Sequence, residues 1–283
     1  NELLQTKTVN RLKSLNFFSK VETEIIDNKD QNTKIIDITV EEKPTGEIMA
    51  GAGIGTSGGT IGFGVSENNF LGRGIEFSTD ISLSADTLKG LIALNNPNYK
   101  GSNRSLNTSV ESTITDRLSD FGYKSTKTGF SIGSSFEFYD DLYWNTGIST
   151  YVEKLETQST ASASMKKQEG SDFDAYFNQT FNYDKRNQKY KTTDGFISRF
   201  SQNIPIISDT YTLTNSYDYK TYNQWLGENI LSLGFYLKSA NSLNGEDVKL
   251  SDRLYLPSNK LRGFEAGKVG PKDGSSFIGG NYT

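Results

Sequence analysis

The stretch Leu106-Asn107-Thr108-Ser109-Val110-Glu111-Ser112-Thr113-Ile114 alternates in character at every second position. Leu106, Val110 and Ile114 fall on one side of an extended chain, whereas Asn107 and Glu111 fall on the other, because successive side chains of a strand point to opposite faces. The stretch therefore predicts a β-strand with one largely apolar and one polar face. The same alternation decides the fold class of most of the chain.

The period of two begins after Gly46 and continues for about two hundred residues, which we interpret as about eleven strands. The faces opposite the apolar ones are polar, as Asp174, Asn178 and Asn182 illustrate for one strand. The other predicted apolar faces are Ile75, Phe77, Thr79, Ile81 and Leu83; Phe130, Ile132, Ser134 and Phe136; Leu142, Trp144, Thr146, Ile148 and Val152; Phe173, Ala175, Phe177 and Phe181; Phe196, Phe200 and Ile204; Tyr211, Leu213, Tyr217 and Tyr219; and Leu231, Leu233, Phe235 and Leu237.

A soluble β-sandwich also alternates, so strand length and connections must separate the two folds. Several predicted strands run 10 to 15 residues, longer than the ~5–6 of globular sheets and sufficient for a tilted membrane span of about 9–11. The connections at 96–101 and 137–141 are short, whereas 158–171 and 242–280 are long. Short turns on one side and long loops on the other are typical of outer-membrane barrels.

Aromatic residues at the predicted strand ends fit the girdles that such barrels place at the membrane interfaces, although in a soluble protein they would be core edges. They are Phe70, Tyr99, Tyr123, Tyr139, Tyr143, Trp144, Tyr183, Tyr190 and Trp225.

The composition excludes several functions. The chain has 283 residues, no Cys, no His and a net charge of -4. Zinc sites with soft ligands and nucleophiles activated by His are therefore excluded. Nucleic-acid binding needs a basic patch, which the net charge argues against. No apolar run approaches the roughly 20 residues of a transmembrane helix, and no cofactor is expected.

The N-terminal part has a different pattern. Leu4, Val9, Leu12 and Leu15 fall at helical spacing, and two strands follow at 21–26 and 34–40 with a polar turn, 27–32, between them. Helix, strand, turn and strand form the back half of a small α/β module, predicted to end near Pro44-Thr45-Gly46. The N-terminus shows no signal peptide, and we expect the chain to be a fragment missing residues at both ends.

Residues 53–58 match the GxGxxG string of dinucleotide-binding sites, but that fingerprint needs a helix after it, and Thr60 to Val65 continue as a strand. We interpret Gly51, Gly53, Gly55, Gly62 and Gly64 as structural. A glycine-rich first strand also has edge hydrogen bonds that open more easily to an incoming strand.

Charged pairs elsewhere suggest no catalytic site. We find no acid/base pair and no accompanying nucleophile motif among the acidic residues Asp140-Asp141, Glu41-Glu42 and Glu228. We interpret them as turn-end acids and exposed charges. Lys166-Lys167 and Lys185-Arg186 are interpreted as solvated loop and turn charges.

Arg262 in Leu261-Arg262-Gly263-Phe264 has two interpretations. Loops as long as this one tend to be functional, and a loop folded back into a polar lumen would let Arg262 pair with a carboxylate of the inner wall. The alternative is that Arg262 is simply exposed to solvent on the loop. Without the rest of the chain, we favour this alternative.

The order and spacing of several segments together resemble the BamA family of outer-membrane assembly factors. Val9 to Val21 and Ile36 to Gly46 look like the end of the last polypeptide-transport-associated (POTRA) domain. The barrel segments that resemble the family are Gly53-Ile54-Gly55-Thr56, Asn69-Phe70-Leu71-Gly72-Arg73-Gly74, Asn95-Asn96-Pro97-Asn98-Tyr99 with one extra residue before Tyr99, Thr193-Asp194-Gly195 after the eighth strand, and Leu261 to Phe264 with Val269-Gly270-Pro271-Lys272 and Gly279-Gly280-Asn281 as the sixth extracellular loop and the entry to the twelfth strand.

The resemblance implies a mainly β fold: an antiparallel transmembrane β-barrel of about sixteen strands, of which this chain holds about 11–12. Residues 1–44 would be the C-terminal part of the last POTRA domain in the periplasm and 45–283 the truncated barrel. Leu261 replaces the commoner Val of the motif. In the family the motif's arginine contacts an acidic residue on a later strand, so the expected partner of Arg262 is missing here.

The function implied is a non-enzymatic outer-membrane insertase that templates client strands at a lateral gate, with a POTRA-containing secretion or translocation pore as the alternative. The implied partners are unfolded outer-membrane β-barrel clients, accessory assembly lipoproteins and outer-membrane lipid. The predicted loop motif is Leu261, Arg262, Gly263, Phe264, Gly270 and Pro271, and the predicted first strand of the gate is Glu47, Ile48, Met49, Ala50, Gly51, Ala52, Gly53, Ile54 and Gly55, extending to Thr56.

Overall fold

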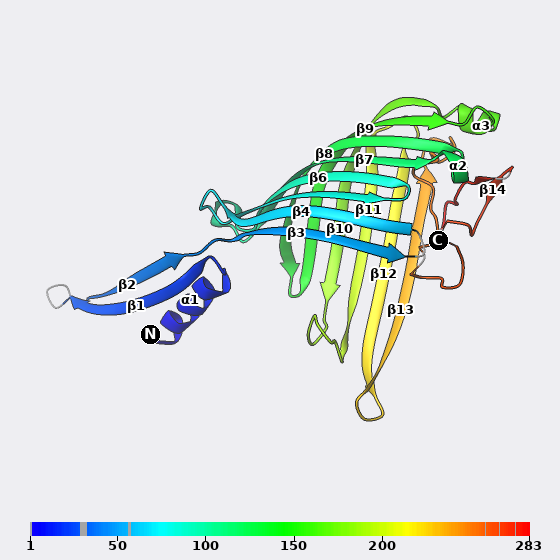
Figure 1. Ribbon diagram of the computed structural model, residues 1–283. Coiled ribbons are helices and arrows are strands. Elements are labelled where there is room, and N and C mark those ends of the chain that lie inside the picture. The colour runs from blue at the N-terminus through cyan, green and yellow to red at the C-terminus, as the bar shows by residue number, and fades with distance from the viewer. Residues whose placement is uncertain (1, 29–32, 56–57, 258, 266, 275) are drawn as a thin grey trace.

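The fold was analysed in a computed structural model (Figure 1). It describes residues 2–28, 33–55, 58–257, 259–265, 267–274 and 276–283. The elements, in chain order, are α1 (Glu2–Ser14), β1 (Phe18–Asn28), β2 (Thr33–Glu42), β3 (Gly46–Gly55), β4 (Gly58–Phe70), β5 (Ile75–Ser84), β6 (Thr87–Asn96), η1 (Tyr99–Gly101), β7 (Ser105–Arg117), α2 (Leu118–Phe121), β8 (Tyr123–Tyr139), β9 (Leu142–Thr157), α3 (Ala163–Lys166), β10 (Gly170–Asp184), β11 (Gly195–Ile207), β12 (Thr212–Trp225), β13 (Asn229–Ser242), β14 (Lys272–Asp273) and β15 (Ser276–Phe277).

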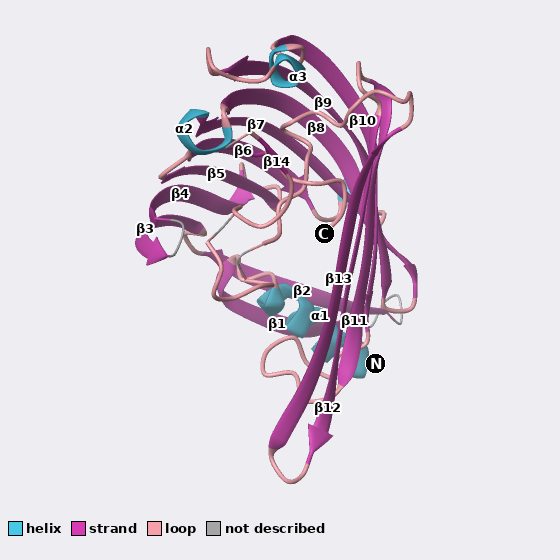
Figure 2. Ribbon diagram, turned by 90° about the vertical axis from the view of Figure 1, so that its right-hand side faces the viewer, coloured by secondary structure: helices cyan, strands magenta, loops and turns pink. Residues whose placement is uncertain are grey.

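Eleven strands, β3 to β13, form one sheet in which each strand pairs antiparallel with its neighbours in sequence. The sheet curves strongly but does not close, since β3 and β13 lie at its two edges (Figure 2). The prediction of a mainly β, antiparallel fold with about eleven long strands is confirmed, and β8 reaches 17 residues.

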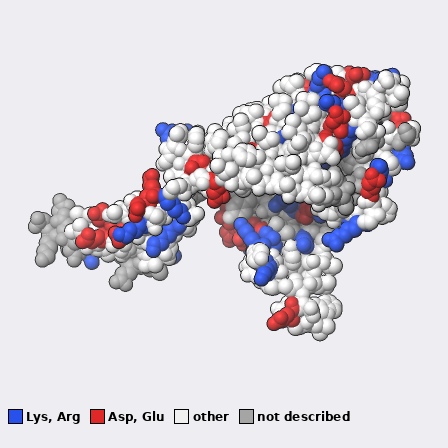
Figure 3. All heavy atoms as spheres, in the orientation of Figure 1, with Lys and Arg blue, Asp and Glu red and all other residues white. Residues whose placement is uncertain are grey.

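The two faces of the sheet have the opposite polarity to those of a soluble domain. Ile81, Val110, Phe130 and Phe235 are about half exposed on the convex face. Polar residues are buried on the concave face instead, including Glu153 and Asp174. Figure 3 shows the outward face almost free of charged side chains, which lie instead at its edge near α2 and α3, below it and over the N-terminal strands. The predicted alternation therefore sorts apolar residues outward and polar residues inward.

Aromatic side chains make a row of ring contacts across the convex face from β8 to β13. Trp144 stacks on Phe181 with ring centroids 5.7 Å apart, and Tyr183 and Phe196 meet edge to face at 5.5 Å. Phe196 and Tyr219 continue the row. These contacts bring Trp144 and Tyr183 of the predicted girdle into one band.

Two residues of the predicted girdle lie elsewhere, so the prediction is wrong for them. Tyr123 is buried in an apolar cluster on the concave side, and Tyr143 lines a concave polar pocket with Asn145 and Asn182. Each of the two lies one residue before an outward-facing position of its strand. A shift of one residue places a side chain on the other face.

The connections differ at the two ends of the sheet, as predicted. The two-residue turn after β8 and the turn containing η1 lie at the end where the N-terminal module joins, while the loops after β9 and β13 lie at the opposite end (Figure 1). The turn charges interpreted as solvated include one exception, since Arg186 is mostly buried in a two-bond pair with Asp184, whose nearest N–O distance is 2.7 Å.

The N-terminal module consists of α1 and the β1–β2 hairpin, connected to β3 by residues 43–45 (Figure 1). Helix, strand and strand follow the predicted order. The helix ends at Ser14, so Leu15 lies just beyond it. Of the predicted turn at 27–32, residues 29–32 lie outside the described residues, as does Thr56. No helix among the described residues is long and apolar enough to cross a membrane.

We predict that Gly129→Ala destabilises the sheet, because the new methyl group would lie 2.2 Å from Tyr151 Cδ1 and 2.6 Å from the Thr150 carbonyl oxygen on the paired strand. The expected loss in the free energy of unfolding is about 1–3 kcal/mol. Urea unfolding of the purified protein in detergent micelles measures it. Gly90→Ala is the matched control, since nothing lies within 4 Å of its Cβ position. Equal effects of the two changes would show that close packing at Gly129 does not matter.

Candidate functional site

The first candidate site is the edge strand β3, which pairs only with β4 and leaves its other edge free within the described sheet. All of the predicted gate residues from Glu47 to Gly55 fall inside this strand. Ile54 is 96% exposed, and Ile48 is also largely exposed. The strand therefore presents backbone hydrogen-bonding groups and apolar side chains together, the combination that pairs with a further strand.

Gly51 and Gly53 in the middle of β3 are not required by close contacts. At Gly51 and Gly53 a Cβ atom would meet nothing within 4 Å. At these two positions the absence of a side chain is therefore not imposed by neighbouring atoms, and the weakening of the first hairpin by its glycines stays a prediction.

The base of β3 is fixed by side chains of the adjoining strand and turn. The Thr45 hydroxyl donates a hydrogen bond to Glu67 Oε1, which also accepts from the Asn69 backbone N–H at 2.8 Å. Asn69 Oδ1 in turn accepts from the Gly74 N–H at 2.7 Å. This network holds the start of β3 against β4, whereas the far end of β3 has no comparable restraint among the described residues.

The second candidate site is the long loop, residues 243–280, which lies on the concave side of the sheet (Figure 2). Lys260 Nζ is 3.2 Å from Asp218 Oδ2 on β12, and it lies over the Tyr236 ring of β13 at 4.8 Å. Both partners are inward residues of their strands. The loop therefore folds back over the inner wall.

The predicted loop motif follows directly after this contact. Leu261 is half-buried, whereas Arg262, Gly263 and Phe264 are exposed. Gly263 has a φ of 86°, a left-handed conformation that favours glycine. Within the described part of the chain the Arg262 guanidinium makes no ion pair or hydrogen bond, so the inner-wall partner remains a prediction.

The loop returns to the sheet that it left. Leu254 and Gly280 exchange two backbone hydrogen bonds of 2.7 and 2.8 Å, and Pro271 accepts one from the Ile278 N–H. The last residues then pair with β13, since Ala240 N–H donates to the Asn281 carbonyl and Lys238 and Thr283 bond to each other. Residues 281–283 thus pair with β13 at the place where the family resemblance implied the entry to a twelfth strand.

An apolar cluster on the concave side holds the loop against α2, β8, β9 and α3. Phe121, Tyr123, Leu155, Met165 and Leu250 are buried in it. Tyr255, Phe277 and Ile278 pack on the cluster from the C-terminal half of the loop. Since the concave face is otherwise polar, this cluster supplies much of the apolar burial that the loop obtains.

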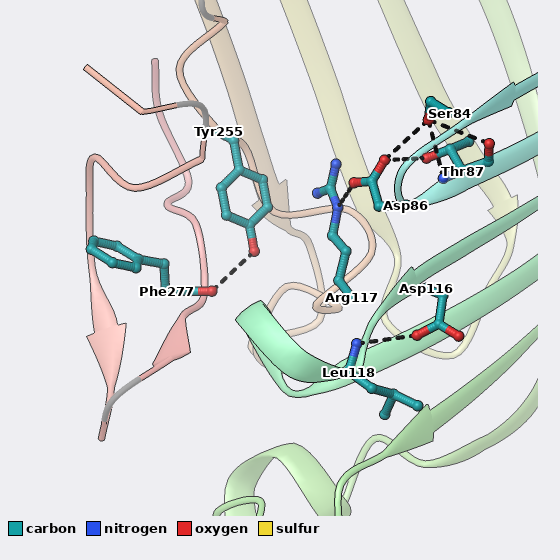
Figure 4. Close-up of polar contacts among 8 residues, drawn as sticks. All are labelled: Ser84, Asp86, Thr87, Asp116, Arg117, Leu118, Tyr255 and Phe277. Carbon is teal, nitrogen blue, oxygen red and sulfur yellow. Dashed lines mark hydrogen bonds and ion pairs between the residues drawn. The ribbon is translucent and has the colours of Figure 1, made fainter. Parts of the chain in front are cut away.

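Arg117 joins the loop to the strand ends (Figure 4). Its Nε lies 2.8 Å from Asp86 Oδ2 in the β5–β6 turn, and its guanidinium lies over the Phe121 and Tyr255 rings at 5.3 and 5.5 Å. Tyr255 donates a hydrogen bond to the Phe277 carbonyl. Burial raises the pKa of Asp86, but the hydrogen bond and charge of Arg117 outweigh it, so the net pKa is lowered.

Lys249 is a further residue of the loop that sequence reasoning missed. Its ammonium group is buried among Asp172, Asp174 and Glu153 of the inner wall. Neither Lys249 nor Arg117 lies in a motif, and their partners are distant in sequence. The one available signal was acidic residues at inward positions of β9 and β10, which require a counter-charge.

The chain was compared with known proteins. The Omp85 superfamily domain matches residues 69–283. The outer membrane protein assembly factor BamA of Nitratidesulfovibrio vulgaris is 25% identical over 288 residues, covering 96% of this chain and 35% of that protein. The chain thus spans about a third of the length of this curated relative.

Solved structures share the fold. BamA from Haemophilus ducreyi lacking POTRA domains 1–3 superposes with a TM-score of 0.86 at 22% identity, over 98% of this chain and 59% of that one. CdiB from Acinetobacter baumannii gives a TM-score of 0.53 at 11% identity, over 90% and 50% of the two chains.

We predict that Arg117→Met loosens the loop, because it removes the Asp86 ion pair and both ring contacts. The expected loss is about 1–3 kcal/mol, since a partly exposed ion pair contributes roughly 0.2–1 and each of the two ring contacts about 0.5–1. Hydrogen exchange at the Leu254 and Gly280 amides measures it. Arg104→Met is the control, since Arg104 lies over the Phe136 ring at the opposite end of β7, away from the long loop.

The effect should depend on pH. A lowered pKa of Asp86 means that the contribution of the pair is fully present above the ordinary pKa of an aspartate and is lost as the pH falls through the lowered value. The difference in protection between the wild type and Arg117→Met should therefore be constant from pH 7 to about pH 4 and shrink below that. A difference that already declines near pH 6 would contradict the assignment to Asp86.

Proposed function

The chain belongs to the Omp85 superfamily, and we propose that it is part of an outer-membrane protein assembly factor that folds and inserts β-barrel proteins by templating their strands at a lateral gate. The observation that carries the proposal is the free edge of β3, a glycine-rich strand beside an apolar outward face. In lipid, unpaired backbone groups cost several kcal/mol each. A client strand therefore gains by pairing with β3 as it enters the bilayer.

The proposal places the strands in the outer membrane of a Gram-negative bacterium. The apolar side chains on the convex face would contact lipid, and the polar concave face would line a wet lumen. We assign residues 1–44 to the C-terminal part of the last POTRA domain, in the periplasm, and 45–283 to a barrel that further strands complete. The fold shared with BamA from Haemophilus ducreyi supports this assignment.

The first strand and the loop motif have different roles in the proposal. Glu47 to Gly55 form the template edge of the gate. Leu261 to Phe264, with Gly270 and Pro271, form the loop motif inside the lumen, where Arg262 pairs with a carboxylate of a later strand. The exposed Arg262 side chain is available for that contact, and a planar guanidinium binds a carboxylate through two parallel hydrogen bonds.

The proposed partners follow from the same mechanism. Unfolded β-barrel proteins of the outer membrane are the clients, accessory lipoproteins bind the periplasmic part, and lipid surrounds the convex face. No covalent step, nucleotide or cofactor is part of the mechanism. A POTRA-containing secretion or translocation pore remains the second candidate, because the CdiB structures share the fold, though at a lower TM-score than BamA.

Depletion of the protein should lower the amount of folded porins in the outer membrane. The reason is that every client depends on the same template edge, whereas an export pore serves its own substrate. Folded porins are counted by their resistance to unfolding in cold detergent gels. Normal porin levels combined with loss of one secreted protein would establish the export pore instead.

Arg262→Ala should impair porin assembly several-fold without changing the amount of the protein itself, because Arg262 makes no stabilising contact among the described residues. Immunoblots measure the expression level, and folded porins measure assembly. Lys268→Ala removes a positive charge from the same loop outside the motif and serves as the control. Unchanged porin levels in Arg262→Ala would remove Arg262 from the site.

A further inference from the structure

Lys249 is a buried cation of the long loop. It is 4% exposed, and its Nζ lies 2.8 Å from Asp172 Oδ2, 3.1 Å from Asp174 Oδ2 and 4.0 Å from Glu153 Oε2. Asp174 and Glu153 are themselves 1% and 2% exposed. One loop residue thus occupies a pocket of carboxylates that belong to two neighbouring strands, β9 and β10.

The pocket is stable only with the lysine in place. Two buried carboxylates on adjacent strands repel each other, and leaving such charges unpaired is strongly unfavourable. Burial alone would lower the pKa of Lys249, but the hydrogen bond to Asp172 and the charges of Asp174 and Glu153 raise it. The ammonium group therefore stays charged, as the pocket requires.

Further carboxylates surround the contact. Asp209 of the β11–β12 loop lies close enough to Asp172 for the interaction to raise the pKa of Asp209. Asp252 of the long loop is partly buried near Glu153 and Asp174, with Lys127 as a second nearby cation. Around Lys249, the concave side of the sheet therefore carries more carboxylates than ammonium groups. Lys249 of the loop thus adds a cation where Lys127 alone is outnumbered by carboxylates.

The neighbours of Lys249 fix the direction of its side chain. Leu250 is buried in the apolar cluster, and its N–H donates to Gln168 Oε1 at 2.9 Å. Val248 packs with Ala240 and Leu254. The Lys249 carbonyl accepts hydrogen bonds from the N–H groups of Asp252 and Arg253, both at 3.0 Å. The backbone is therefore held on both sides of the buried ion pair.

We propose that Lys249 is a positioning residue that fixes the incoming limb of the long loop to the inner wall and so sets where the loop motif lies in the lumen. The proposal rests on the proposed function of the motif. The loop is anchored by an ionic contact with β9 and β10, which is present although Arg262 makes no ion pair among the described residues. Lys260, near the motif, adds a weaker and more exposed contact with Asp218.

The test uses the full-length protein with three variants. Lys249→Met removes the charge and Lys249→Arg keeps it. Lys167→Met is the matched control, because Lys167 joins the β9–β10 loop to Glu246 of the long loop through a 4.0 Å contact between two exposed side chains. Hydrogen exchange of the Leu254 and Gly280 amides reports loop position, and folded porins report assembly.

Lys249→Met should raise exchange of the loop amides at least about tenfold and lower folded porins, since breaking a buried pair leaves its carboxylates uncompensated. Lys249→Arg should restore both readouts, and Lys167→Met should change neither. Exchange in Lys249→Met at the wild-type rate, or no rescue by Lys249→Arg, would overturn the anchor. Faster exchange with normal porin levels would overturn the positioning role while leaving the insertase function, which depletion tests, intact.

A second variant covers failure of Lys249→Met to fold. Lys249→Met combined with Asp172→Asn and Asp174→Asn removes the lysine together with two of its carboxylates, so no strongly repelling charges remain. This variant should fold and still show faster exchange of the loop amides than the wild type. Protection at the wild-type level would show that the apolar neighbours Val248 and Leu250 hold the loop without Lys249, which would overturn the proposal.

Discussion

The whole structure depends on one constraint: every backbone N–H and C=O of a long, outward-apolar strand must find a partner on a neighbouring strand. The strands between β3 and β13 meet it on both sides by pairing antiparallel in sequence order, with continuous registers such as that between β9 and β10, whereas β3 meets it on one side only within the described sheet. Because the hydrogen bonds satisfy the backbone, side chains are free to sort by polarity. They do so in the opposite sense to a soluble core, with Phe130 and Phe235 outside and Glu153 and Asp174 inside.

Polar residues on the concave face create a second requirement, since buried carboxylates need cations. The long loop meets it with Lys249 and adds apolar side chains such as Leu250, which pack where α2 and α3 provide an apolar surface. Electrostatic and hydrophobic contacts thus act on adjacent residues of one segment. The loop is consequently an integral layer of the fold, in contrast to the exposed motif that it carries.

Sequence periodicity predicted the long strands of the sheet and its short and long connections, because these follow from local alternation and turn residues, whereas the gate position of the first strand came from the family resemblance. Features set by distant contacts were not predicted. The Lys249–Asp174 bond joins residues 75 positions apart, and nothing in the order of the strands indicates it. Tyr123 was misplaced because one residue of register decides between the two faces. Arg262 is exposed, as in the alternative interpretation, while its pairing with a carboxylate stays a proposal.

The long loop also has a geometric consequence. It is joined at one end to β13 through residues 281–283, and it reaches across the concavity to Arg117 at the end of β7 and to the carboxylates of β9 and β10. Contacts that link two separated points of a curved sheet limit how far those points can move apart. While they hold, the span between β7 and β13 cannot widen, so any flattening of the wall must occur in the unlinked portion from β3 to β5.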